Sequence, residues 1–113
     1  MSGRGVSLGP IFRREEQLMH RYVIEREIPK VGQFGRQQLS DAAQKSNAVL
    51  AQLGPDIQWI ESFVADDKTF CVYLAKDATV IRKHAEISGF PASRITEIKR
   101  MIDPTTGTNG AGR

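Results

Sequence analysis

The chain has 113 residues, of which 40% are hydrophobic and 26% are charged, which suits one globular domain. Its single cysteine excludes an intrachain disulfide and a zinc site built from several cysteines. The net charge is +3, but the basic residues are scattered among acidic neighbours without a basic stripe, so we expect no nucleic-acid partner.

Both ends of the chain are expected to be flexible. Residues 1–18 show no sustained periodicity, and residues 105–113 are rich in Gly and Thr, which leaves 19–104 as the folded domain. The beginning of the chain lacks the continuous apolar stretch of a secretory signal. No apolar run approaches the roughly 20 residues that cross a bilayer. We therefore expect a cytoplasmic protein with no membrane partner.

The first half of the domain predicts a strand followed by a helix. Residues 22–28, "YVIEREI", are rich in β-branched and aromatic side chains and end at Pro29, which favours a strand. Residues 36–53 repeat apolar or small side chains at alternating spacings of four and three, which is typical of an amphipathic helix. Gly54 and Pro55 then end this helix.

The second half predicts a hairpin, a helix and a last strand. Two short apolar segments flank "ADDK", whose aspartates suit a tight turn. Asp77 is the expected N-cap of a helix that ends at Gly89. The segment "RITEIKRMIDP" alternates in character and predicts a strand that closes at Pro104.

The order β-α-β-β-α-β predicts a ferredoxin-like α+β fold, with a four-stranded antiparallel sheet and two helices on one face. Side chains alternate along a strand, so each strand divides into two sets. We assign the wholly apolar sets to the helix side; they are Tyr22, Ile24, Ile28, Phe70, Val72 and Leu74. The uncovered face is then expected to display Val23, Glu25, Trp59, Glu61, Phe63, Cys71, Tyr73, Ile95, Glu97, Lys99 and Met101.

This expected face mixes large apolar groups with carboxylates. Exposed apolar patches usually mark interaction surfaces, so we expect a second copy of the chain to pack here and form a homodimer. The dimer would enclose carboxylates, and a buried carboxylate needs a cation, a basic partner or a proton. A bound metal ion would satisfy several carboxylates at once.

Several segments resemble a bacterial family of small domains of unknown function that includes an actinobacterial cytosolic nickel-binding protein. They are "RYVIEREIP", "QKSNAVLAQLG", "QWIESFVADDKTFCVYLAKD" and "IRKHAEISGFPASRITEIKRMIDP", and together they cover roughly residues 20–106. The resemblance implies a ferredoxin-like subunit that pairs into a dimeric α/β barrel, and it implies a role with nickel. It supplies no ligand list, so the site must be argued from chemistry.

Two residues allow either a structural or a functional interpretation. Cys71 is a small core residue or a metal ligand; it is a poor nucleophile because its neighbours Phe70 and Val72 supply no base. His84 lies beside the apolar stripe of its helix and is a packing residue or a metal ligand, which His20 could assist.

The carboxylates are also open to two interpretations. Glu25, Glu61 and Glu97 pair with basic side chains such as Lys99, or form a cluster of metal ligands or acid–base groups.

The predicted function is binding of a divalent transition metal, nickel, by a homodimer, for sequestration or sensing rather than catalysis. The predicted metal ligands are His84, Glu25, Glu61, Cys71 and Glu97. The alternative is a small dimeric α/β-barrel enzyme of oxygenase or isomerase type, with an organic ligand in a cavity formed by Trp59, Phe63 and Tyr73. A third possibility is a non-catalytic interaction module.

Overall fold

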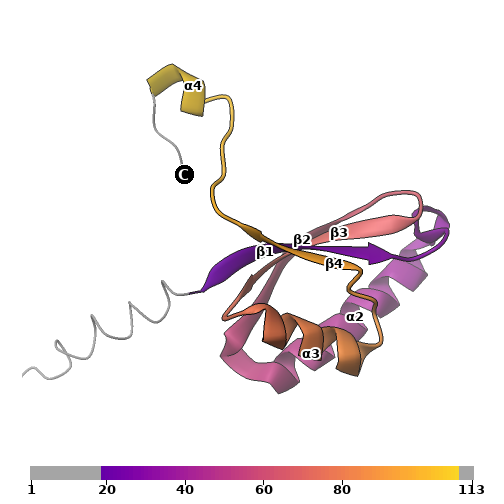
Figure 1. Ribbon diagram of the computed structural model, residues 1–113. Coiled ribbons are helices and arrows are strands. Elements are labelled where there is room, and N and C mark those ends of the chain that lie inside the picture. The colour runs from indigo at the N-terminus through magenta and orange to yellow at the C-terminus, as the bar shows by residue number, and fades with distance from the viewer. Residues whose placement is uncertain (1–18, 110–113) are drawn as a thin grey trace, which may run out of the picture.

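The computed structural model describes residues 19–109 (Figure 1). The arm expected at 1–18 and the last four residues lie outside this range. Residues 105–109 of the expected C-terminal tail include the short helix α4 (Thr106–Asn109), which stands away from the sheet in Figure 1.

The described chain contains one four-stranded antiparallel sheet with strand order β2-β3-β1-β4. Its strands are β1 (His20–Glu27), β2 (Ile57–Val64), β3 (Lys68–Ala75) and β4 (Arg94–Ile98). The helices α2 (Arg36–Leu53) and α3 (Ala78–Ser88) both cover the same face of the sheet (Figure 1). Two short 3-10 turns, η1 (Val31–Gln33) and η2 (Gly54–Asp56), complete the connections. The predicted ferredoxin-like fold is confirmed.

The helix ends follow the expected capping chemistry. The Asp77 side chain accepts a hydrogen bond from the Val80 backbone N–H at 3.1 Å and so caps the first turn of α3. Gly89 ends α3 with a left-handed φ of 83°, a conformation that costs glycine little. Gly54 plays a similar part after α2, with φ 79°.

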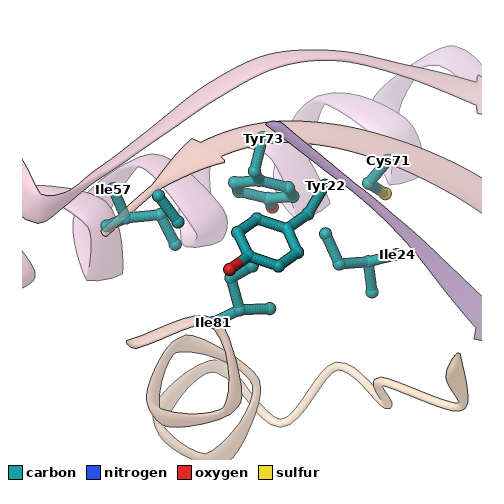
Figure 2. Packing of buried hydrophobic residues seen from close by; sticks show 7 residues of the cluster. Tyr22, Ile24, Ile57, Cys71, Tyr73 and Ile81 are labelled. Carbon is teal, nitrogen blue, oxygen red and sulfur yellow. The ribbon is translucent and has the colours of Figure 1, made fainter. Parts of the chain in front are cut away.

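The core lies between the sheet and the two helices. It consists of Tyr22, Ile24, Ile57, Cys71, Tyr73, Ala75 and Ile81. Tyr22 of β1 lies opposite Tyr73 of β3, and Ile24 lies opposite Cys71. Directly opposed residues project to the same face, so both β3 side chains lie on the same side of the sheet as Tyr22 and Ile24, within the core that Figure 2 shows.

The predicted orientation of β3 is therefore wrong. Cys71 and Tyr73 are only 6% and 2% exposed beneath the helices. Phe70, Val72 and Leu74 lie on the uncovered face instead, where each is half-buried. Both faces of β3 are apolar, so hydrophobicity alone does not distinguish them. The register with β1 decides the orientation, because Cys71 and Tyr73 lie opposite the core residues Ile24 and Tyr22.

The predicted orientation of β2 is wrong at Trp59. A β-bulge between Trp59 and Glu61 shifts the register, so Trp59 lies opposite Tyr73 on the helix side. Beyond the bulge, Glu61 and Phe63 lie opposite Val72 and Phe70 on the uncovered face, where they were expected.

The edge strand β4 also differs from its prediction. Ile95 and Glu97 lie opposite Ile24 and Tyr22 and therefore belong to the helix side. The strand ends at Ile98, which lies opposite Arg21 in the last β1–β4 pair. Lys99 and Met101 consequently lie outside the sheet.

Gly32 allows η1 to lie directly against the β2–β3 turn. Its N–H donates to the Asp66 carbonyl at 2.9 Å, and a Cβ at this position would lie 2.8 Å from the Ala65 oxygen. Because that neighbour is backbone, Gly32→Ala is expected to lower the free energy of unfolding by about 1–3 kcal/mol. Urea denaturation measures this change. Gly107→Ala meets nothing within 4 Å and is the matched control; equal stability of the two variants would contradict the close approach.

Candidate functional site

His84 lies in the interior, where α2 and α3 meet the sheet. Its side chain is 0% exposed, its Nε2 lies 3.1 Å from the Ser46 hydroxyl, and its ring contacts Tyr73. Burial, helped by the positive charge of Arg26, lowers the pKa of His84 to about 4, so the imidazole is neutral at pH 7. Within residues 19–109, its Nδ1 has no hydrogen-bond partner. These contacts are those of a packing residue.

The structure separates the five predicted metal ligands. His84 and Cys71 lie beneath the helices, whereas Glu25 and Glu61 lie on the uncovered face. Glu25 forms an ion pair with Lys68, with Nζ and Oε1 3.1 Å apart. In the described part of the chain, no group of three or more His, Cys, Asp or Glu could hold a metal ion. The expected single cluster is therefore not formed within one chain, and the metal role of each residue stays a prediction.

Glu97 does have an imidazole partner, but it is His20 and not His84. Glu97 Oε2 lies 3.1 Å from His20 Nδ1 and 3.3 Å from Lys99 Nζ, and the His20 and Glu97 side chains are both partly exposed. The β1–β4 register explains this proximity, because Glu97 is opposite Tyr22, two residues from His20 on the same face. From the sequence, His20 was expected only to assist His84 in binding a metal. Its position at the start of the first strand did not indicate which residue of another strand would lie beside it.

A pocket of about 470 Å³ lies between α2 and the sheet. Two of the three residues that were predicted to form a ligand cavity, Trp59 and Tyr73, line this pocket. Phe63 does not, because it lies on the opposite face and is 56% exposed. The cavity thus lies beneath the helices rather than on the uncovered face.

Arg26 is part of this pocket and was not anticipated as a site residue. Its side chain is 3% exposed, and its guanidinium donates to the Pro91 carbonyl at 2.8 Å and to the Tyr73 hydroxyl at 3.4 Å. The alternation of β1 contained the signal, because position 26 continues the inward set of Tyr22 and Ile24.

The electrostatics around Arg26 are unusual for a buried cation. Across residues 19–109, no carboxylate lies within 4 Å of its guanidinium nitrogens. Its charge instead lies near the rings of Tyr73 and Phe90, at 5.9 and 6.0 Å from their centroids. Burial raises the pKa of the Tyr73 phenol above its ordinary value, although Arg26 opposes the shift, so the hydroxyl stays neutral.

Fold and site together define a ferredoxin-like α+β domain with one covered sheet face, one uncovered face and an internal pocket. The model of the family described as "Nickel responsive protein SCO4226-like" matches residues 22–98, which is more than half of the chain. The chain belongs to this family, and the resemblance noted from its sequence is confirmed.

The structure is similar to the crystal structure of SCO4226 from Streptomyces coelicolor A3(2). The TM-score is 0.62 at 16% sequence identity, and the match covers 73% of this chain and 99% of that chain. At this identity the likeness supports the fold. None of the curated proteins matches this sequence. No helix within residues 19–109 is both long and apolar enough to cross a membrane.

Proposed function

We propose that the protein binds nickel as a cytoplasmic homodimer and that His20 and Glu97 provide the first two ligands. The observation that supports this site most directly is the 3.1 Å separation of His20 Nδ1 and Glu97 Oε2 at the surface. Nickel accepts imidazole together with carboxylate and water ligands. Membership of a family described as nickel responsive favours this metal among those with similar ligand preferences.

This pair supplies only part of a coordination sphere. Among the described residues no third His, Cys, Asp or Glu joins it, so further ligands would come from water or from a second copy. His84 and Cys71 are buried, and neither is hydrogen-bonded to a described carboxylate, so the proposed site omits them. Glu25 and Glu61 lie on the face where the second copy is proposed to pack, and they would contribute only in the dimer.

The uncovered sheet face supports a homodimer. Its centre is apolar, formed by Val23, Val72 and Phe70 of adjacent strands, and Phe63 at its edge is 56% exposed. The segment after β4 leaves the sheet and presents Ile102 at 78% exposure (Figure 1). Apolar groups in this arrangement are typical of a surface that another copy covers.

Nickel titration by calorimetry tests the proposed site, using full-length protein without a histidine tag. His20→Ala and Glu97→Gln are each expected to weaken nickel binding at least about tenfold, because each removes a ligand. Glu86→Gln is the matched control, because Glu86 is exposed on α3, away from the proposed site and from the uncovered face, and this variant should bind nickel as the wild type does. Equal affinity in all four proteins, or no binding by the wild type, would overturn the proposal.

A further inference from the structure

We propose that the pocket between α2 and the sheet binds a small organic acid, with its carboxylate paired to Arg26 and its apolar body against the pocket walls. This inference is independent of the nickel site. The pocket lies toward the β2 edge of the sheet, whereas His20 and Glu97 lie at the β4 edge.

The first argument is the missing counter-ion. A buried charge is costly unless it is paired, and the described residues place only neutral acceptors around Arg26. Two of these are backbone carbonyls, of Phe90 and Pro91, and the third is the Tyr73 hydroxyl. A guanidinium group matches the geometry of a carboxylate, so a bound acid would supply the absent negative charge.

The second argument is the shape and lining of the pocket. A volume of about 470 Å³ lies within the range of small-molecule sites. Val31, Phe34, Leu39 and Ala43 form apolar walls, with Leu39 and Val64 exposed at the rim. The polar groups lie deeper, around Arg26 and Tyr73. Phosphate would leave several charged oxygens against apolar walls, so this lining favours a monocarboxylate with an apolar body.

The third argument is the absence of competing negative charge at the floor. None of the described residues that line the pocket is an Asp or a Glu, and burial keeps the Tyr73 phenol neutral by raising its pKa. A carboxylate that enters the pocket therefore meets the positive charge of Arg26 without a negative group beside it.

Trp59 provides a direct reporter of occupancy. It is the only tryptophan in the chain, it lines the pocket, and its indole N–H donates to the Ser62 hydroxyl at 2.9 Å. Fluorescence titration of the full chain with octanoate is expected to give a saturable change. Octanol, the neutral analogue of similar length, should bind at least about tenfold more weakly, because it lacks the charge that pairs with Arg26. Inorganic phosphate should give no saturable change.

Two variants test separately the contribution of the Arg26 charge and that of the free volume of the pocket. Arg26→Gln is expected to weaken octanoate binding at least about tenfold while leaving octanol binding unchanged. Ala43→Leu extends into the pocket from α2 without removing Arg26 and should weaken both ligands, and it keeps the test valid if Arg26→Gln does not fold.

Three results would overturn the inference. The first is equal affinity of the wild type for octanoate and octanol. The second is no saturable signal with either ligand. The third is a Trp59 signal that depends only on protein concentration, which would indicate that a second copy occupies the pocket.

Discussion

Aspartate in place of Val72 is expected to convert the proposed dimer into a monomer, weakening self-association at least about a hundredfold. Val72 lies on the uncovered face between Val23 and Glu61 of the neighbouring strands. In a dimer built on this face, the new carboxylate would be buried beside an existing one without a basic partner, which is strongly unfavourable. Sedimentation equilibrium of the two proteins at equal concentration measures the change.

Ala48→Asp is the matched control for this charge. It introduces the same side chain at an exposed position of α2, which lies on the other side of the sheet. This variant should dimerise as the wild type does. A wild-type protein that is monomeric at micromolar concentration, or a dimeric Val72→Asp variant, would exclude the uncovered face as the interface.

Acid is expected to destabilise the protein through His84, by about 2 kcal/mol between pH 7 and pH 5. The pKa of His84 is lowered from 6.5 to about 4 in the folded state. Between these values the unfolded state binds the additional proton, so stability is retained above pH 6.5 and is lost as the pH falls toward 4. Urea denaturation across this pH range measures the free energy of unfolding.

Two substitutions test whether His84 causes the loss of stability in acid. His84→Leu removes the buried imidazole and should reduce the pH dependence by about 2 kcal/mol, whatever its effect on stability at pH 7. His20→Gln removes the other histidine of the chain and should retain the pH dependence. An unchanged slope in His84→Leu would show that the imidazole is not buried in neutral form.

The proposed nickel site and the proposed acid pocket would draw on different chemistry in different parts of the domain. His20 and Glu97 are partly exposed at the β4 edge, where a metal ion can reach them from solvent. Arg26 is buried, and its cation attracts anions and repels metal ions. Loss of one function is therefore not expected to remove the other.

The local pattern of the sequence was sufficient to predict the helices and strands and their order along the chain. The spacing of apolar residues in 36–53 specified α2, and Asp77 and Gly89 marked the ends of α3, because capping and periodicity depend on residues a few positions apart. The order of strands and helices then left one common topology, the ferredoxin-like fold.

Only the tertiary structure decided which side chains meet. Apolar residues lie on both faces of β3, so the orientation of Cys71 and Tyr73 depended on its register with β1. The bulge at Trp59 likewise belongs to the pairing of β2 with β3. The contact of Ser46 with His84, and that of Arg26 with Pro91, join residues distant in the chain. Such contacts arise from packing between elements, which the periodicity of a single segment does not encode.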